Sequence, residues 1–301
     1  MTAPSTAFRG EADYHRMRRL LQRAWAATGP RVSMTVGDLD FWRHQRDAPP
    51  LEKTCRLWLD STGEAIGFAW ASEGFIDVTV CVGASSLLRP MMDWAEEALR
   101  GRDATDRAIS TAALDCDGPH EVELARRGYR RTDAFHHWYR TRSLRRRVEN
   151  APLPAGYALR SVTEADAWAE VASLIDRTAA APSFTAEGWR ALASSPTYRS
   201  ELDLLAIAPD GGLAAHCTGW FDSANRTLLL EPVGCVPDHR RRGLARALVL
   251  ETLRRGSDLS ATVALVASDG RSQAANATYE SLGLAPGARK WVWTQSPRAA
   301  G

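Results

Sequence analysis

Hydrophobic residues in the second half of the chain recur with two periods, one typical of strands and the other typical of helices. Short apolar runs separated by Gly, Asp and Asn predict a meander of three antiparallel strands. A helical repeat follows the meander, in which Leu244, Ala247 and Leu248 fall on one face. The predicted strands of this half are 157–162, 202–208, 213–221, 227–236, 262–267 and 291–294, and the predicted helices are 164–178, 186–194, 244–255 and 274–282.

The first half shows the same order of elements, so the pattern indicates an internal duplication. This order matters because it allows the two copies to be compared position by position. The predicted helices of the first half are 13–26, 91–99 and 121–127, and its predicted strands are 55–59, 65–71, 75–82, 108–114 and 135–139.

A charged, proline-containing stretch between the halves predicts a domain boundary. Residues 140–156 read RTRSLRRRVENAPLPAG, which is typical of a connection rather than of a core. We therefore place the boundary near Asn150. The expected fold is α+β (mixed α/β), with two tandem domains at 1–150 and 151–296 and a short tail at 297–301.

The composition is typical of a soluble globular protein and argues against several classes of function. Of 301 residues, 45% are hydrophobic and 25% are charged, and no apolar run approaches the ~20 residues that span a bilayer. A formal net charge of +2 gives no field that would favour nucleic acid as a partner. The N-terminus lacks the pattern of a secretory signal, so a cytoplasmic location is expected. Five cysteines without CxxC spacing favour reduced thiols over a disulfide framework or a zinc site, and no metal is expected.

The candidate chemistry lies at the junction between the last meander strand and the helix after it. Arg240 to Ala245 have the form R-x-x-G-x-A. Backbone N–H groups at a helix N-terminus bind anions, and Gly243 lets an anion approach the main chain closely. A pyrophosphate fits such a segment, with His239 and the arginines adding charge around it. Two other interpretations of the hexapeptide stay open, namely a basic first turn with a tight-turn glycine and a run of solvated arginines.

Two segments resemble the signatures of the GNAT superfamily of N-acetyltransferases. Residues 233–245 resemble its acetyl-CoA-binding motif, Q/R-x-x-G-x-G/A, and residues 276–284 resemble its later motif, in which an Asn begins a helix and a Tyr precedes a Leu-Gly end. The resemblance covers about residues 154–294, while the first half resembles the family only in the order of its elements. The tandem layout is similar in architecture to that of mycothiol synthases. It implies two GNAT-like domains, each with a mostly antiparallel, splayed sheet flanked by helices.

The resemblance implies acetyl-CoA as the cofactor, with coenzyme A as the product. The pantetheine arm would lie between the strand that ends at Val236 and the strand at 262–267, and Pro232 is consistent with such an opening. The residues that the resemblance implies for cofactor binding are Cys235, Val236, Arg240, Arg241, Arg242, Gly243, Leu244, Ala245, Asn276 and Tyr279.

Two side chains match catalytic roles, since acyl transfer needs a base for the amine and an acid for the departing thiolate. Tyr279 matches the family tyrosine that protonates the thiolate, with packing beneath the helix as the alternative. Glu231 is the candidate base, because it lies on the strand that often carries a catalytic carboxylate in the family, although it could instead shape the substrate pocket. The backbone N–H around Cys235 would face the thioester carbonyl, and the Cys235 thiol is a packing group rather than a nucleophile.

The first half lacks both signatures. Residues 82–90 contain no R-x-x-G-x-A pattern, and matching Gly128 to Gly283 puts Leu124 at the position of Tyr279. We therefore predict one cofactor site per chain, in the second domain. The first domain could wall the acceptor pocket, and each candidate for that role could equally be a core or surface residue. These candidates are Trp42, Trp70, His136, His137 and Trp138.

The leading hypothesis is direct transfer of an acetyl group to a primary amine of a small-molecule acceptor. The alternative is a non-catalytic acyl-CoA-binding sensor or regulatory module. The presence of both Glu231 and Tyr279 favours an enzyme. The acceptor, the acyl-chain preference and the oligomeric state stay open at this point, and a homodimer is among the possible states.

Overall fold

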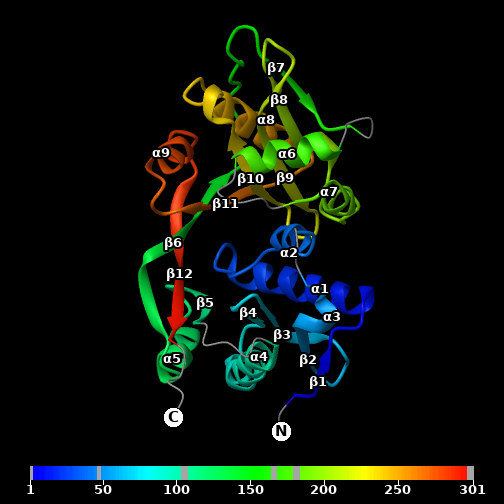
Figure 1. Ribbon diagram of the computed structural model, residues 1–301, viewed down its shortest axis with the longest axis vertical. Helices are drawn as coiled ribbons and strands as arrows, with labels where there is room; N and C mark the ends of the chain where they lie inside the picture. The colour runs from blue at the N-terminus through cyan, green and yellow to red at the C-terminus, as the bar shows by residue number, and fades with distance from the viewer. Residues whose placement is uncertain (1–2, 46–48, 103–107, 164–167, 179–183, 297–301) are drawn as a thin grey trace.

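The computed structural model describes residues 3–45, 49–102, 108–163, 168–178 and 184–296 (Figure 1). The helices are α1 (Glu11–Thr28), α2 (Val36–Trp42), α3 (Leu51–Thr54), α4 (Leu88–Arg102), α5 (Gly118–Arg126), α6 (Trp168–Thr178), α7 (Ala186–Leu192), α8 (Leu244–Asp258) and α9 (Gln273–Ser281). The strands are β1 (Ser5–Ala7), β2 (Cys55–Leu59), β3 (Ala65–Ser72), β4 (Phe75–Val80), β5 (Ile109–Leu114), β6 (Arg130–Ser143), β7 (Ala158–Ser161), β8 (Asp203–Ile207), β9 (Leu213–Asp222), β10 (Thr227–Cys235), β11 (Val263–Asp269) and β12 (Ala285–Gln295).

The predicted elements are confirmed, although several of their ends are wrong. The meander consists of β8, β9 and β10, paired antiparallel. The strands predicted at 135–139 and 291–294 are much longer, because β6 and β12 pair with each other along most of their length. The start of the helix predicted at 164–178 and the tail at 297–301 lie outside the described residues. Helices α2 and α3 and strand β1 were not predicted.

The strands form a single sheet with a palindromic order. That order is β1-β2-β3-β4-β5-β12-β6-β11-β10-β9-β8-β7. Exchanging each strand with the one six places away in the chain reproduces the same order reversed, as expected for an internal duplication. Strand β12 lies between β5 and β6, and β6 lies between β12 and β11. Each half therefore inserts its last strand into the sheet of the other half, and Figure 1 shows β6 and β12 running side by side between the halves.

The strand exchange makes the two halves continuous. Leu144 and Val148, in the stretch predicted to be a connection, are buried in the core of the second half. The division into 1–150 and 151–296 therefore stays a prediction, because pairing and packing both cross it.

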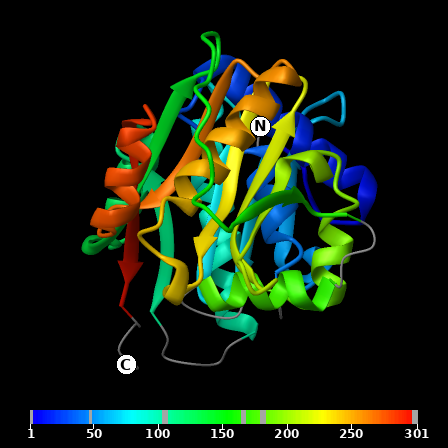
Figure 2. The same ribbon diagram turned by 90° about the horizontal axis from the view of Figure 1, so that it is seen from above.

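The sheet of the second half is covered on both faces. Side chains alternate between the faces of a strand, so Leu228 and Leu230 of β10 pack toward α8 while Leu229 packs with the residues of α6 and α7. Figure 2 shows α6 (green) and α8 (gold) on opposite sides of the yellow strands. One face of β10 thus packs toward α8, and the other packs toward α6 and α7.

Helix α2 of the first half packs against the second half, on the face that carries Leu229. The ring of Phe41 lies 4.9 Å from that of Phe184 and 5.9 Å from that of Trp220. The helix comes this close because of Gly37, where an added Cβ would lie 2.8 Å from the Cβ of Trp220. A capping box between Thr35 and Asp38 fixes its first turn.

The parallel ladder between β10 and β11 opens partway along its length. Pairing runs from Thr227 opposite Val263 to Leu229 opposite Leu265 and goes no further within the described residues, although β10 continues to Cys235. The register of β10 also shifts between Leu230 and Val233. The predicted splay is therefore present. β11 pairs with β6 along its whole length, and beyond Leu265 this is its remaining pairing within the described residues.

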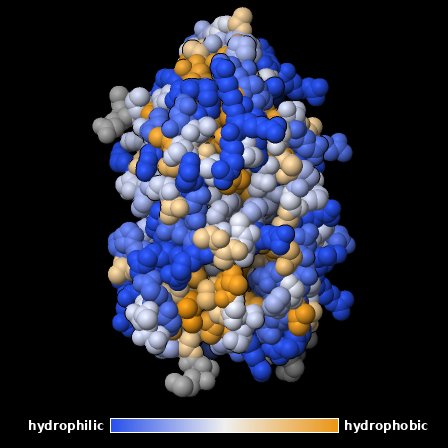
Figure 3. Space-filling model, turned by 180° about the vertical axis from the view of Figure 1, so that it is seen from behind, coloured by the Kyte–Doolittle hydropathy of each residue, from blue (hydrophilic) through white to orange (hydrophobic). Residues whose placement is uncertain are grey.

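Two large hydrophobic side chains of the first half are exposed to solvent. Val82 and Val122 are exposed by 65% and 69% and both belong to this half. Seen from behind, hydrophobic residues gather in the lower part of the molecule (Figure 3). Across the described residues, we find no helix with both the length and the hydrophobicity that crossing a membrane requires.

Candidate functional site

The N-terminus of α8 has free backbone amides and lies at the protein surface. Gly243 caps the helix with φ +84°, in the left-handed region, and no side chain caps the free amides. An added Cβ at Gly243 would meet nothing within 4 Å, so the space in front of these amides is clear. Leu244 is buried beneath the first turn and Ala245 is half-buried. Unpaired N–H groups at the positive end of a helix dipole suit a phosphate or pyrophosphate.

The basic side chains before α8 contact their own loop and are exposed to solvent. The Arg240 guanidinium donates to the carbonyl of Cys235 at 3.0 Å, and that of Arg242 lies 3.4 Å from the carbonyl oxygen of Asp238. Arg241 is exposed and has φ +60°. His239 bonds through Nδ1 to the hydroxyl of Tyr157 at 2.9 Å. These charges surround the helix start, and their contact with a cofactor stays a prediction.

The end of β10 offers one backbone donor to the opening beside it. The N–H of Val236 donates to the carbonyl of Ala214 on β9 at 2.9 Å. Successive amides of an extended strand point to opposite sides, so the N–H of Cys235 points away from β9 and toward the opening. Burial raises the pKa of the half-buried Cys235 thiol, which agrees with a packing role.

Tyr279 lies on the α8 side of the sheet. It is only 8% exposed and packs with Leu228, Leu230 and Val266. Burial, with Cys217 and Glu231 nearby, raises its pKa well above the usual range. No donor or acceptor of the described residues hydrogen-bonds to its hydroxyl, so that group keeps its proton and has it available for a ligand.

The helix that carries Tyr279 is fastened by Asn276 and by an arginine of the first half. Asn276 donates to the carbonyls of Asp269 and Gly270 and accepts from Ser268. The buried Arg140 guanidinium of β6 also donates to Asn276, at 3.2 Å, and pairs with Glu280 of α9. The amide of Asn276 is thus engaged by the protein itself, and its predicted contact with the cofactor stays untested.

Glu231 lies on the opposite face of the sheet from Tyr279. Its carbonyl accepts a hydrogen bond from the Trp220 indole, and its carboxyl lines one cavity together with Asp38 and Trp42. Burial and the neighbouring Asp38 raise the pKa of Glu231 well above its usual range. Within the described residues, no N–H or hydroxyl donates to its buried Oε2.

A cavity of about 270 Å³ begins at Glu231 and is shared by the two halves. Glu231 and Ala267 each lie two residues beyond the last β10–β11 pair, Leu229 with Leu265, so the cavity reaches the opened ladder. A second cavity of about 240 Å³ continues from it. The lining of the first cavity is Asp38, Trp42, Gln45, Phe75, Asp77, Ala112, His137, Tyr139, Glu231, Ala267, Lys290 and Val292.

Three of the five residues considered as walls of an acceptor pocket line these cavities. Trp42 and His137 line the first cavity, and Trp70 lines the second. His136 and Trp138 do not line either one. The His136 ring lies 4.5 Å from that of Trp291, and the Trp138 ring lies 4.0 Å from the Arg289 guanidinium.

Sequence reasoning missed three charged groups of the cavity, namely Asp38, Asp77 and Lys290. The Thr35-x-x-Asp38 spacing is a capping box and could have revealed the start of α2. Lys290 is one of only two lysines in a chain rich in arginine, which was a further signal. Asp77 carried no signal of its own.

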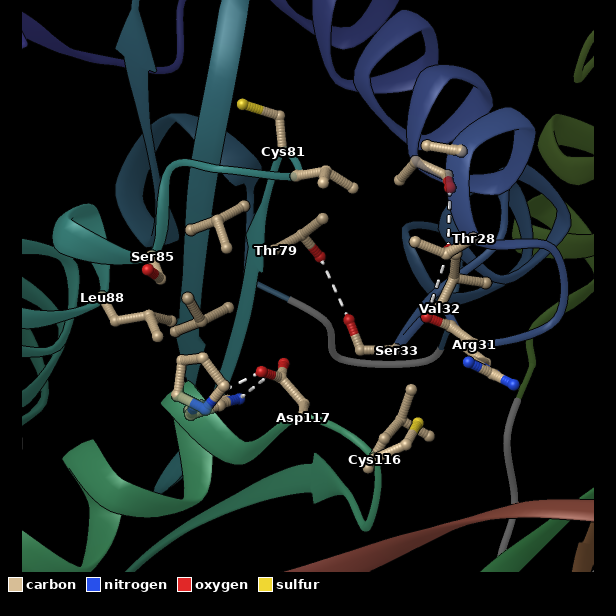
Figure 4. Close-up of a pocket in the computed structure, with 18 of the residues that line it drawn as sticks. Thr28, Arg31, Val32, Ser33, Thr79, Cys81, Ser85, Leu88, Cys116 and Asp117 are labelled. Atoms are coloured by element: carbon tan, nitrogen blue, oxygen red, sulfur yellow. Dashed lines mark hydrogen bonds and ion pairs between the residues drawn. The ribbon is translucent and has the colours of Figure 1, made fainter.

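The first half keeps a comparable opening without the anion-binding loop. Strands β4 and β5 pair only at Phe75 with Ser110 and at Ile76 with Thr111. A cavity of about 490 Å³ lies beside the unpaired ends. Figure 4 shows the Thr79 hydroxyl pointing toward that of Ser33 across this cavity, 3.5 Å away. The prediction of a single cofactor site per chain stays untested.

Comparison with known proteins gives a family and a fold. Residues 168–284 match the acetyltransferase (GNAT) family, and a comparison with curated proteins found no match. The chain is similar to a GCN5-related N-acetyltransferase from Sphaerobacter thermophilus, with 19% identity and TM-score 0.69 over 99% of this chain and 96% of that one. It is also similar to a tandem GNAT protein from the clavulanic acid biosynthesis pathway, with 18% identity and TM-score 0.71 over 99% of both chains.

A third similar structure is the N-myristoyltransferase of Saccharomyces cerevisiae with bound myristoyl-CoA. The identity is 13% and the TM-score 0.60, over 99% of this chain and 80% of that one. At such identities the likeness shows the fold alone. The predicted fold of two tandem GNAT-like units is thereby confirmed.

Proposed function

Because residues 168–284 are an acetyltransferase domain of the GNAT family, we propose that the chain transfers an acetyl group from acetyl-CoA to the primary amine of a small molecule. Acyl transfer from an acyl-CoA is the reaction class of the family. The acetyl group, the amine and direct attack are our proposals, as are a cytoplasmic site of action and one cofactor site per chain.

The observation that supports this reaction best is the arrangement of Glu231 and Tyr279 about the opened ladder. They lie on opposite faces of the sheet, and Glu231 lies two residues beyond Leu229, where the pairing of β10 with β11 ends. A thioester in this opening would have a carboxylate on one side and a phenol on the other. Attack and departure at a carbonyl need a base and an acid in these positions.

The cofactor would be held by main-chain groups more than by side chains. The amides at Gly243, Leu244 and Ala245 would bind the pyrophosphate, with Arg240 to Arg242 adding positive charge near it. The N–H of Cys235 would donate to the thioester oxygen and stabilise its developing negative charge. The opening beside β10 would take the pantetheine arm.

Each proton has a proposed carrier. Glu231 takes a proton from the protonated amine, directly or through water, and the neutral nitrogen, which keeps two hydrogens, forms a bond to the carbonyl carbon. When the carbon–sulfur bond breaks, the sulfur takes a proton from the Tyr279 hydroxyl, because the phenol is the acid on that side. Tyr279 is then protonated again by the nitrogen of the new amide, through water.

Calorimetry and a thiol-release assay test the proposal together. Acetyl-CoA should bind with one site per chain, and two sites or none would refute the single-site assignment. Release of free thiol in the presence of a panel of primary amines would establish an enzyme. If acetyl-CoA binds and the whole panel fails, the non-catalytic acyl-CoA sensor becomes the better hypothesis.

A further inference from the structure

Four charged groups line the cavity between the halves, and three of them are acidic. Asp38 comes from α2, Asp77 from β4 and Glu231 from β10, while Lys290 of β12 is the one Lys or Arg in the described part of the lining. Both halves of the chain thus supply carboxyl groups to one enclosed space. A buried charge without a partner is costly. The charges that line the cavity therefore restrict the charge of the acceptor that can bind there.

Among the described residues, Lys290 forms an ion pair with Asp77 and with neither of the other two carboxyls. Its ammonium lies 3.7 Å from Oδ1 of Asp77, donates to the carbonyl of Ser33 at 2.9 Å and lies 5.2 Å from the Trp42 ring. Lys290 is only 5% exposed. Burial raises the pKa of Asp77 and the nearby ammonium lowers it, so this pair accounts for one negative and one positive charge.

Asp38 and Glu231 form no ion pair with a cation of the described residues, although the Lys290 ammonium lowers the pKa of Glu231. Asp38 is 2% exposed, and its Oδ2 accepts from the backbone N–H and the hydroxyl of Thr35 at 2.6 and 2.7 Å. Both carboxyls line the same cavity, and burial and the neighbouring Asp38 raise the pKa of Glu231 well above its usual range. Because two neighbouring buried carboxyls do not readily ionise together, Glu231 holds a proton in the free protein.

The remaining polar groups of the cavity bring no charge to this pair. Burial and the Lys290 ammonium lower the pKa of His137 to about 4, so the ring is neutral near pH 7. The Tyr139 hydroxyl donates to the carbonyl of Ser33 at 3.0 Å, and burial raises its pKa. The negative charge at Asp38 and Glu231 thus forms no ion pair with the described lining of the cavity.

We propose that this cavity binds the acceptor as an organic cation, with its ammonium nitrogen against Asp38 and Glu231, and that its body carries no carboxylate. This inference rests on the proposed function, and it deepens that function by naming the acceptor class. An ammonium group supplies N–H donors to Oε2 of Glu231 and replaces the proton that Glu231 holds. That proton leaves to solvent as the acceptor binds.

The proton balance makes Asp38 part of the acceptor site. After binding, both carboxyls are ionised, and Glu231 can take one proton from the ammonium to give the free amine. The pair then holds one proton again, as in the free protein. The second proton of the attacking nitrogen ends on the coenzyme A thiol, so the net reaction releases the single proton that was lost on binding.

The aromatic lining of the second cavity favours an acceptor with an apolar body. Trp42, Phe75 and Asp77 line both cavities, and Trp70 lines the second. Aromatic walls stack with flat or apolar groups and attract cations. The described lining of the second cavity contains Glu73 and Asp77 and no basic side chain, so a carboxylate there would be repelled.

A matched pair of probes tests the inference on the full chain with acetyl-CoA. 2-Phenylethylamine and phenylalanine share an aromatic body and an amine and differ by one carboxylate. We expect 2-phenylethylamine to have a kcat/KM for thiol release at least about tenfold higher. With coenzyme A in place of acetyl-CoA, calorimetry in two buffers of different ionisation enthalpy should count about one proton released per amine bound near pH 7.

Two variants assign the effect to the carboxyl pair. Asp38→Asn keeps the side-chain oxygen that caps α2 but removes the carboxyl that raises the pKa of Glu231, so the proton release should decrease and the amine affinity should fall about tenfold or more. Glu187→Gln makes the same change in charge at an exposed position of α7 outside both cavities. It should behave like the parent chain in both measurements.

Three results would overturn the inference. They are equal or better use of phenylalanine, amine binding without proton release, and no binding of either probe at millimolar concentration. Failure of acetyl-CoA to bind would instead refute the proposed function. Binding of acetyl-CoA with turnover of a neutral or carboxylated acceptor leaves the function intact and refutes only the acceptor class.

Discussion

The carboxyl of Asp38, on helix α2 of the first half, lines the same cavity as the carboxyl of Glu231, on strand β10 of the second half, and raises the pKa of Glu231. Both groups lie at the wall of a cavity that opens onto the gap between β10 and β11. The acidic character of this cavity therefore depends on contact between the halves. The raised pKa of Glu231 in this cavity also makes the stability of the free protein depend on pH.

The first prediction concerns the proton on Glu231. Its pKa is raised above an ordinary value of 4.5 by burial and by Asp38, so above that pH the folded chain binds more protons than the unfolded chain. The free energy of unfolding contributed by this group must then fall as pH rises, by at most about 1.4 kcal/mol per pH unit. Urea unfolding from pH 5 to 8 should show Glu231→Gln gaining stability relative to the parent chain. Glu187→Gln should show no such gain. If the free energies of unfolding of Glu231→Gln and of the parent chain changed equally with pH, the proton on Glu231 would be contradicted.

The second prediction concerns the start of α8. Gly243→Glu adds bulk and a negative charge at a helix N-terminus that is open to solvent, and we expect acetyl-CoA affinity to fall on the order of 100-fold. Gly63→Glu is the matched control, because Gly63 also has a positive φ, +81°, and open space around it. Calorimetry should find the control unchanged. Equal losses in both variants would mean that backbone strain, not the ligand, causes the effect.

The third prediction separates chemistry from binding at Tyr279. Tyr279→Phe removes a buried hydroxyl that has no partner in the described part of the chain, so packing should be kept while kcat falls about 100-fold. Affinity for acetyl-CoA should change little. Tyr129→Phe is the control, since Tyr129 is a buried tyrosine of the first half that lines neither of the two cavities next to Glu231. An unchanged kcat in Tyr279→Phe would remove this residue as the acid.

The local parts of this site could be predicted from the sequence. The anion loop and the helix that carries Tyr279 are contiguous segments, and their glycine and helical spacing indicate their structure directly. Glu231 could be placed on the correct strand for the same reason. The raised pKa of Glu231 could not be predicted, because it depends on Asp38. Asp38 lies on a seven-residue helix, which is too short to show a clear helical period of hydrophobic residues.

The strand exchange is the other feature that the sequence did not reveal. A period of two shows that residues 285–295 form a strand and which side chains share a face, but it does not identify the neighbouring strands. β12 pairs with both β5 and β6, so its partners lie in the first half. Lys290 enters the cavity only because of this pairing, which is why a strand pattern alone could not assign it to the site.

The fourth prediction concerns a buried ion pair of the first half that is also hydrogen-bonded to the second half. Asp40 of α2 is fully buried, and both its oxygens lie 2.6 Å from the Arg18 guanidinium. It also accepts from the hydroxyls of Tyr14 and Thr197. Asp40→Asn leaves Arg18 buried without its counter-charge, so we expect a loss of about 3–5 kcal/mol in the free energy of unfolding.

An exposed ion pair provides the comparison for Asp40. Glu64 pairs with Arg19, and their side chains are 36% and 47% exposed. Solvent screens such a pair, so Glu64→Gln should cost at most about 1 kcal/mol. Urea unfolding of the two variants under the same conditions measures both values. A small and equal loss in both would show that the Asp40 network does not hold the halves together.

The last prediction follows from the exchange of β6 and β12. Without residues 151–301, strand β5 and one edge of β6 lose their partner β12, and the other edge of β6 loses β11. Unpaired strand edges with apolar faces favour aggregation over a stable fold. We therefore expect residues 1–150 expressed alone to lack cooperative unfolding, and 1–150 coexpressed with 151–301 to form a stable complex that binds acetyl-CoA. Size-exclusion chromatography with near-UV circular dichroism measures both states. A monomeric 1–150 fragment that unfolds cooperatively by itself would instead support two independent domains, because its sheet would then be stable without the strand that the second half inserts.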